Sequence, residues 1–157
     1  MAQDPVVTFI ETQSGWPTHH QEKDGLTITQ DHFIQRDGIE YAGTHLILDL
    51  WGASNLDDLT LMEDAMKAAV KAAKATLLHI HLHHFTPNYG ISGVAVLAES
   101  HISVHTWPER NFAAFDIFMC GAAIPERAIP VLEEAFKPTQ LNVNEMLRGM
   151  HTTKGTQ

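Results

Sequence analysis

The sequence predicts an α+β fold in which an antiparallel sheet carries helices packed on one face. Two observations indicate this class. Apolar runs of strand length follow one another through the middle of the chain, and only two stretches show the 3.6-residue periodicity of a helix. After residue 42 the order is strand, helix, four strands, helix and a final segment of strand character. A chain dominated by consecutive strands favours a two-layer antiparallel sandwich over a parallel α/β sheet.

The first elements follow from local patterns. Residues 44–51 are rich in leucine and isoleucine and are expected to form a buried strand. Residues 57–74 are expected to form a helix, because their apolar residues recur at helical spacing. Asp57 and Asp58 suit the positive end of its dipole. Further strands are expected over residues 76–85, 93–98, 101–107 and 112–120.

The two ends of the chain are less regular. A second helix is expected over residues 125–136, with Pro125 in its first turn. Residues 138–150 are expected to be a weaker strand or a tail. Residues 1–42 are mixed and polar, and they are interpreted as an N-terminal extension of unknown role. The domain itself is therefore expected to cover residues 43–157.

The composition limits the possible partners. The 157 residues suffice for one domain with a core but not for two ordinary ones. A formal net charge of -9 argues against a nucleic-acid partner and suits a cationic ligand. The single cysteine cannot form an internal disulfide, which fits a cytoplasmic location. No signal peptide is evident, and no apolar run approaches the roughly 20 residues that span a bilayer, so no membrane partner is expected.

The most informative stretch surrounds the dipeptide Glu99-Ser100. If residues 108–111 form a four-residue hairpin loop, Trp107 faces Phe112 and, at the other end of the hairpin, Cys120 faces Glu99. Facing pairs in an antiparallel sheet lie roughly 5 Å apart. A lone cysteine is usually a buried structural residue, but this register brings it beside a serine and a carboxylate and favours a functional role.

His105 presents a different geometry. It follows Ser100 by five residues, which span roughly 16 Å of extended strand. Either the strand bends sharply after His101, or His105 serves the Ser100 of a second protomer. We expect the second arrangement, a homodimer with composite active sites, because closed twofold dimers are the commonest assembly.

These residues belong to a larger pattern. The sequence resembles the small prokaryotic S-adenosylmethionine decarboxylases, which are self-processing enzymes. The matching segments are Gly43-Thr-His-Leu46 with Asp49, Ser92-Gly-Val94, Glu99-Ser-His101, His105-Thr-Trp-Pro-Glu109 and Phe118-Met-Cys-Gly121.

The resemblance implies that the chain cleaves itself between Glu99 and Ser100. The Ser100 hydroxyl would attack the Glu99 carbonyl, His105 would remove the Ser100 α-proton, and Ser92 would be a second processing residue. The product is a pyruvoyl group derived from Ser100. Such a group forms a Schiff base with the substrate amine and accepts electrons as carbon dioxide leaves. Cys120 would then return a proton to the α-carbon.

The resemblance also implies a binding site for S-adenosylmethionine and a role in polyamine (spermidine) synthesis. Glu109 corresponds to the carboxylate that holds the ribose hydroxyls, and Phe85 to the aromatic that stacks on adenine. The loop between Phe85 and Ser92 is one residue longer than is usual in the family, so Tyr89 is an alternative stacking residue.

Other patterns have simpler interpretations. His79, His81 and His83 would share one strand face with neighbours about 7 Å apart, so a solvated or interfacial histidine face is favoured over a zinc site, and no metal is expected. Met62, Met66 and Met146 are expected to fill the core. Two rival functions remain: a pyruvoyl-dependent arginine or ornithine decarboxylase, and a dimeric binding module that never cleaves.

Overall fold

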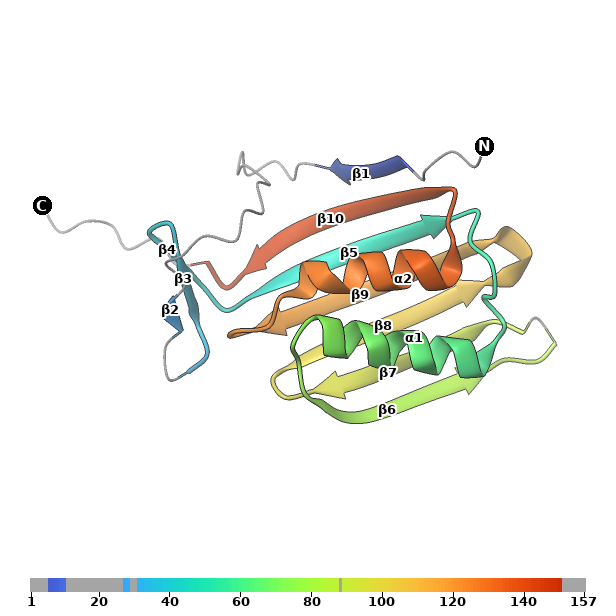
Figure 1. Cartoon of the computed structure of the whole chain (residues 1–157), viewed down its shortest axis with the longest axis horizontal. Helices are drawn as coiled ribbons and strands as arrows, with labels where there is room; N and C mark the ends of the chain where they lie inside the picture. Colours follow the sequence, from blue (N-terminus) through green and yellow to red (C-terminus); the bar gives the residue numbers. More distant parts are fainter. Residues whose placement is uncertain (1–5, 11–26, 29–30, 88, 151–157) are drawn as a thin grey trace, which may run out of the picture.

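The structure is a computed structural model of the chain and describes residues 6–10, 27–28, 31–87 and 89–150. Its centre is a seven-stranded sheet in the order β1-β10-β5-β9-β8-β7-β6 (Figure 1). The strands are β1 (Val6–Ile10), β5 (Gly43–Trp51), β6 (Leu77–His84), β7 (Ile91–Leu97), β8 (Ser100–Trp107), β9 (Phe112–Cys120) and β10 (Gln140–Arg148). β1 pairs with β10 in parallel, and the other neighbours are antiparallel.

From Gly43 onward the element order agrees with the prediction. Helix α1 (Leu59–Ala72) follows β5, and helix α2 (Ala128–Phe136) precedes β10. Two short 3-10 turns, η1 (Pro108–Arg110) and η2 (Pro125–Arg127), lie between β8 and β9 and before α2. The prediction of a mostly antiparallel sheet with two helices is therefore confirmed. The segment that was ambiguous between strand and tail is β10, which pairs with β5 along its whole length.

The segment before Gly43 is more regular than its composition predicts. Besides β1 it contains β2 (Thr27–Ile28), β3 (Ile34–Arg36) and β4 (Ile39–Tyr41), which form a small antiparallel sheet. Ile34 and Tyr41 are buried. Strands of two or three residues are too short to show a periodic pattern, which explains why sequence reasoning missed them. A domain boundary at residue 43 stays a prediction.

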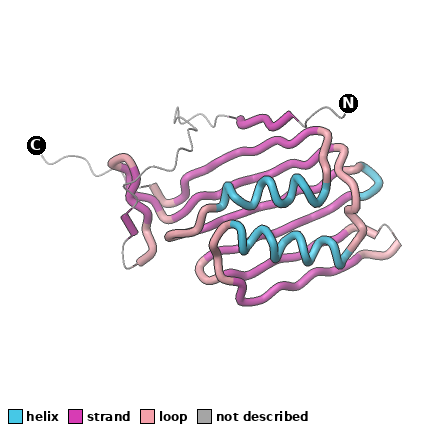
Figure 2. The backbone as a smooth tube through the Cα atoms, viewed as in Figure 1, coloured by secondary structure: helices cyan, strands magenta, loops and turns pink. Residues whose placement is uncertain are grey.

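Both helices lie side by side on the same side of the sheet (Figures 1 and 2). Side chains along each strand alternate between the helix side and the opposite side. Those facing the helices are buried and meet the apolar residues of α1 and α2. This core includes Leu46, Leu48, Leu50, Met62, Met66, Ile102, Val104, Phe115, Ile117, Leu132 and Phe136.

Helix α1 has a defined start. The side chain of Asp58 is its N-cap and accepts a hydrogen bond from the Leu61 backbone N–H at 2.9 Å. This contact pairs one of the four N–H groups that a helix leaves without a partner at its first turn. The predicted acidic start of the helix is therefore confirmed for Asp58.

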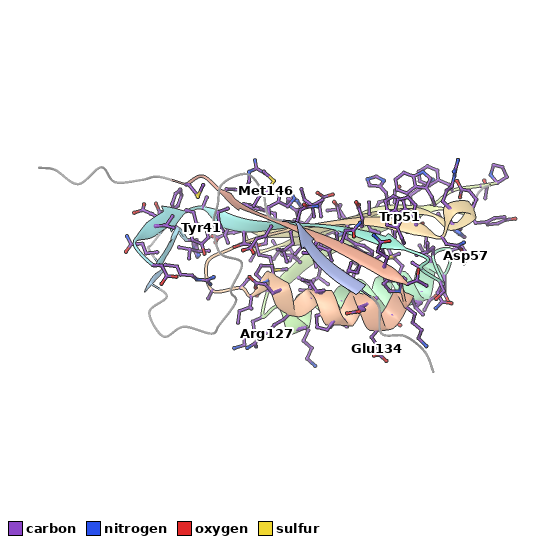
Figure 3. All side chains as sticks on the ribbon, turned by 90° about the horizontal axis from the view of Figure 1, so that it is seen from above. Tyr41, Trp51, Asp57, Arg127, Glu134 and Met146 are labelled. Atoms are coloured by element: carbon purple, nitrogen blue, oxygen red, sulfur yellow. The ribbon has the colours of Figure 1, made fainter. Side chains whose placement is uncertain are left out.

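Among the described residues, no helix covers the sheet face opposite α1 and α2, which is called the open face below. Figure 3 shows Trp51 and Met146 on this side and Arg127 and Glu134 on the helix side. The expectation that Met146 fills the core is wrong, because its side chain is 41% exposed, whereas Met62 and Met66 are buried as predicted. Met146 lies opposite His45 in the β10–β5 register, which places it on the open face.

The histidines of β6 lie at the edge of the sheet. His79, His81 and His83 are exposed, while Ile80 and Leu82 pack against the core, as the alternation predicts. Within the described ranges, no group of three or more histidine, cysteine or carboxylate side chains is placed to hold a metal ion. Over the same ranges, no helix is both long and apolar enough to cross a membrane.

Candidate active site

Ser100 is the first residue of β8 and follows a two-residue turn. Leu97 of β7 pairs with Ser100, so Ala98 and Glu99 form the connection. Glu99 has a φ of 64°, a left-handed conformation that is uncommon for a residue with a side chain. Ser100 is only 8% exposed, and its Oγ accepts a hydrogen bond from the Cys120 backbone N–H at 3.2 Å. The serine hydroxyl is therefore held in a fixed position next to the Glu99-Ser100 peptide bond.

Cys120 is the last residue of β9 and is partly buried. Burial raises the pKa of its thiol, and the negative charge of Glu99 raises it further. Cys120 pairs with Gly43 of β5, where a Cβ would lie 2.6 Å from the Met119 carbonyl oxygen. Glycine at position 43 therefore allows β5 to lie close to the end of β9. The arrangement keeps a protonated thiol beside Ser100 at neutral pH.

The hairpin between β8 and β9 has the predicted register. Trp107 pairs with Phe112, His105 with Ala114 and Ser103 with Asp116. Pro108–Arg110 forms η1, and Asn111 closes the loop with a left-handed φ of 49°. The register explains how Cys120 comes to lie beside Ser100.

His105 lies near the other end of β8 and is exposed. It pairs with Ser92 of β7, and Ser92 Oγ lies 2.7 Å from His105 Nδ1. This contact fixes the plane of the imidazole ring and engages one of its two nitrogens. The structure therefore brings together Ser92 and His105, which the sequence analysis assigned to the same process.

The predicted substrate-binding residues surround the same end of β8. Glu109 lies in η1, the turn that begins directly after Trp107, and its side chain is exposed. Phe85 and Tyr89 flank the loop after β6 and are 46% and 56% exposed. The Phe85 ring contacts His83 edge-on at 4.5 Å, and the Phe85 backbone N–H donates to the Gly90 carbonyl at 2.8 Å. Asn88 of this loop lies outside the described residues.

Ser100 and His105 lie on opposite sides of the sheet. In β8, Ser100, Ile102, Val104 and Thr106 are buried on the helix side, whereas His101, Ser103, His105 and Trp107 alternate with them on the open face. The two predicted catalytic side chains are thus separated by roughly 16 Å of strand and by the sheet itself. One protomer does not bring them together.

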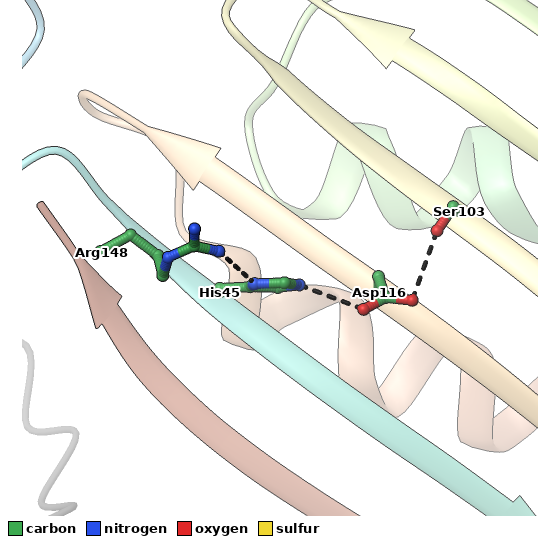
Figure 4. A network of polar contacts seen from close by, with 4 residues as sticks. All are labelled: His45, Ser103, Asp116 and Arg148. Atoms are coloured by element: carbon green, nitrogen blue, oxygen red, sulfur yellow. Dashed lines mark hydrogen bonds and ion pairs between the residues drawn. The ribbon is translucent and has the colours of Figure 1, made fainter.

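A polar network occupies the open face between these two ends (Figure 4). Asp116 Oδ1 lies 3.2 Å from His45 Nε2, and Ser103 donates to Asp116 Oδ2 at 3.5 Å. Arg148 Nη1 lies 3.2 Å from His45 Nδ1. Because arginine has only donors, His45 Nδ1 accepts and Nε2 donates to Asp116.

The polar network contributes to the pKa shifts of two neighbouring side chains. Burial and then the charge of Asp116 raise the pKa of Asp49. Burial and then His45 lower the pKa of His101, while Asp116 opposes them. Within the protomer, Arg148 and Asp116 each contact His45 and not one another in the described hydrogen bonds.

His32 is a residue that sequence reasoning missed. Its Nδ1 lies 2.8 Å from Glu99 Oε2, and its carbonyl oxygen accepts a hydrogen bond from the Gly121 N–H at 3.2 Å. The segment around it has no motif, and the contact joins parts of the chain that are far apart in sequence. No pattern within the sequence of this segment indicates such a contact.

Comparison with known proteins shows which family this chain resembles. The family described as S-adenosylmethionine decarboxylase matches residues 44–149. A protein of Thermomicrobium roseum named S-adenosylmethionine decarboxylase proenzyme is 48% identical over 109 residues, which cover 69% of this chain and 94% of that protein. A protein of the same name from Methanococcus vannielii is 49% identical over 111 residues, covering 69% and 90% of the two chains.

A solved structure gives the same result. The crystal structure of the adenosylmethionine decarboxylase from Aquifex aeolicus superposes with a TM-score of 0.66 at 30% sequence identity. The match covers 74% of this chain and 98% of that one. The fold, the segments around Ser100 and the extent of these matches lead to one conclusion: the chain belongs to the S-adenosylmethionine decarboxylase family.

Proposed function

We propose that this protein is an S-adenosylmethionine decarboxylase that makes its own pyruvoyl group by cleaving the Glu99-Ser100 bond. The observation that carries the proposal is the position of Ser100. Its hydroxyl is buried, held by the Cys120 N–H and adjacent to a carbonyl whose residue has a left-handed φ. The names of the relatives include the word proenzyme, which denotes a precursor.

The cleavage uses atoms that the chain itself supplies. Ser100 Oγ attacks the Glu99 carbonyl carbon, the C–N bond breaks, an ester forms and the hydroxyl proton passes to the nitrogen. Removal of the Ser100 α-proton then expels the Glu99 carboxylate. Water hydrolyses the resulting imine, which releases ammonia and leaves a pyruvoyl group at the start of the second chain. The Cys120 N–H holds Oγ for the first of these steps.

The α-proton requires a base, and we assign this role to His105 of a second protomer. His105 Nδ1 is engaged by Ser92, so Nε2 is the nitrogen that takes the proton. A homodimer formed through the open faces of two sheets would bring the partner's His105 to the open-face side of Ser100, opposite its hydroxyl, and it is the α-proton rather than the hydroxyl that His105 must reach. Large apolar side chains on this face support such a contact, namely Val96, Trp51, Trp107 and Met146. Arg148 and Asp116 at its centre each hydrogen-bond to His45 within the protomer, which lowers the cost of covering them.

The finished site needs a carbonyl, a proton donor and a pocket for the nucleoside. The pyruvoyl group supplies an electrophilic carbonyl that captures the substrate amine and accepts electrons as carbon dioxide leaves. Cys120 is the proton donor, since burial and Glu99 raise its pKa and keep the thiol protonated. Glu109 holds the ribose hydroxyls, and Phe85 or Tyr89 stacks on adenine. These three residues lie at the end of β8 that carries His105, so in the dimer they would serve the partner's Ser100.

Two measurements test the proposal. Denaturing electrophoresis and intact-mass analysis should find chains of 99 and 58 residues (157 minus 99), the smaller one with a blocked N-terminus. Ser100→Ala removes the attacking oxygen and should leave one full-length chain. Fragments that persist in Ser100→Ala would point to a contaminating protease, and an intact wild-type chain would support a binding module.

The substrate is tested separately. Purified protein should release labelled carbon dioxide from carboxyl-labelled S-adenosylmethionine, with arginine and ornithine assayed in parallel. Release from either amino acid but not from S-adenosylmethionine would instead favour the arginine or ornithine decarboxylase, the alternative that the longer loop before Ser92 leaves open.

A further inference from the structure

His32 belongs to the N-terminal segment, outside the part of the chain that the family matches. It nevertheless contacts the residue before Ser100, Glu99, and the residue after Cys120, Gly121. Its imidazole Nδ1 lies 2.8 Å from the Glu99 carboxylate, and its backbone carbonyl accepts the Gly121 N–H at 3.2 Å. One residue therefore links the carboxylate before the predicted cleavage point to the backbone after Cys120.

The backbone conformations at this junction are unusual. His32, Glu99 and Gly121 have φ values of 63°, 64° and 61°, so three left-handed residues meet at one place. Residues with side chains persist in this region when their surroundings hold them there, and such positions cluster at functional sites. A turn with a left-handed residue at its second central position usually has glycine or asparagine there. Glu99 is neither, and the described contact that its side chain makes is the one to His32.

We propose that His32 is a positioning residue for self-cleavage. By binding the Glu99 carboxylate it keeps the turn in the conformation from which the Ser100 hydroxyl attacks the Glu99 carbonyl. His32 takes up no proton in this step. The inference rests on the proposed function, because it concerns the rate of the same cleavage.

The exposure of the pair determines what its loss should change. The side chains of His32 and Glu99 are 50% and 51% exposed, and contacts between exposed polar side chains contribute little to folding. The bond from Gly121 uses the His32 backbone and survives a change of side chain. Replacing the imidazole should therefore leave the fold intact and slow the cleavage.

Two substitutions separate the side chain from the backbone. His32→Asn places an amide N–H near the position of Nδ1, and asparagine tolerates a left-handed φ. His32→Gly tolerates the same conformation without strain but has no donor. Lys137→Gly, at an exposed left-handed residue that follows α2 on the helix side, is a matched control.

The experiment follows the appearance of the two fragments after cell-free synthesis of the full chain. We expect His32→Gly to slow cleavage about fivefold, as for the loss of one hydrogen bond. His32→Asn and the Lys137→Gly control should stay within about twofold of wild type. The melting temperature of each position-32 variant, measured in a Ser100→Ala background, should match that of the Ser100→Ala parent.

The outcomes distinguish the two proposals. If the wild type cleaves and His32→Gly cleaves at the same rate, the role of His32 is overturned and self-cleavage stands. If His32→Asn is as slow as His32→Gly, a hydrogen bond to Glu99 is not the cause, and the role is overturned as well. A large fall in melting temperature that accompanies slow cleavage in His32→Gly overturns it in favour of a structural effect. If the wild type never cleaves, the proposed function fails first.

Discussion

The two ends of β8 differ in what surrounds their reactive side chains. At the first end, Ser100 is buried and is held by the backbone of Cys120, next to Glu99 in its strained turn. At the second end, His105 is exposed on the open face and is oriented by Ser92. Glu109 follows it in η1, also exposed.

Under the proposed function, the two ends of β8 have different roles. The first end is enclosed and fixes one bond, as an intramolecular attack requires. The second end is open and presents an imidazole, a carboxylate and aromatic rings, as the binding of a ligand or a partner requires. Because β8 keeps an unbroken register with its neighbours and its side chains alternate, neither end reaches the other within one protomer. Changes at the two ends should therefore have different consequences.

The largest effect on turnover is expected at the first end, from Cys120→Ala. This change removes the thiol but keeps the backbone N–H that holds Ser100 Oγ. Self-cleavage should therefore continue, while carbon dioxide release falls about 100-fold to 10,000-fold, the usual cost of losing a general acid. Fragment yield and carbon dioxide release, measured on the same preparation, check both parts. A variant that releases carbon dioxide at the wild-type rate would exclude Cys120 as the proton donor.

Glu109→Gln at the second end should affect binding of the substrate. Loss of a charged hydrogen-bond acceptor corresponds to about a tenfold to hundredfold rise in the KM for S-adenosylmethionine. Cleavage and kcat should change little. Steady-state kinetics on fully cleaved protein measure the two constants, with Glu134→Gln on the outer side of α2 as a control. A fall in kcat at constant KM would contradict a binding role.

Ser92→Ala tests whether the second end also takes part in cleavage. Without the 2.7 Å contact to its hydroxyl, the His105 ring loses its orientation. The cleavage half-time should lengthen about twofold to tenfold, as for the loss of one neutral hydrogen bond. Ser103→Ala, a serine on the same face whose hydroxyl contacts Asp116 at 3.5 Å, is the matched control. Equal cleavage rates for the two variants would exclude a role of Ser92 in processing.

The smallest expected effect is on the titration of the Cys120 thiol. Burial and Glu99 raise its pKa, so the reactive thiolate forms at higher pH than in a free cysteine. In the uncleaved Ser100→Ala chain, the pH midpoint of alkylation should lie above that of a cysteine peptide. Since the chain has one cysteine, the label reports on this site alone. Glu99→Gln should lower the midpoint without reaching the peptide value, because burial is the larger cause. If Glu99→Gln leaves the midpoint unchanged, the charge of Glu99 does not raise the pKa of the Cys120 thiol.

Local patterns were sufficient to predict much of the first end. The four-residue loop before Phe112 sets the β8–β9 register, and that register places Cys120 beside Ser100. The odd spacing of Ser100 and His105 also determines that they lie on opposite faces of a strand. The sequence analysis considered only the distance between the two residues, and the structure shows that they also lie on opposite faces.

Other features depend on contacts that no local pattern encodes. Met146 has the apolar character of a core residue, but its place in β10 points it to the open face. β3 and β4 are three residues each, and His32 meets Glu99 only because the fold brings distant segments together. Periodicity describes one helix or strand at a time, so it cannot predict contacts between distant segments.

The central claim is that the two ends act together only between protomers. It is tested by co-expressing a Ser100→Ala chain and a His105→Ala chain that carry different tags. Each chain alone should remain uncleaved. In heterodimers isolated through both tags, the His105→Ala chain should be cleaved, since its Ser100 meets the partner's intact His105. With random pairing of equal amounts, about half of all His105→Ala chains should be cleaved. Isolated heterodimers in which both chains stay intact, or cleavage of the His105→Ala chain on its own, would contradict the account.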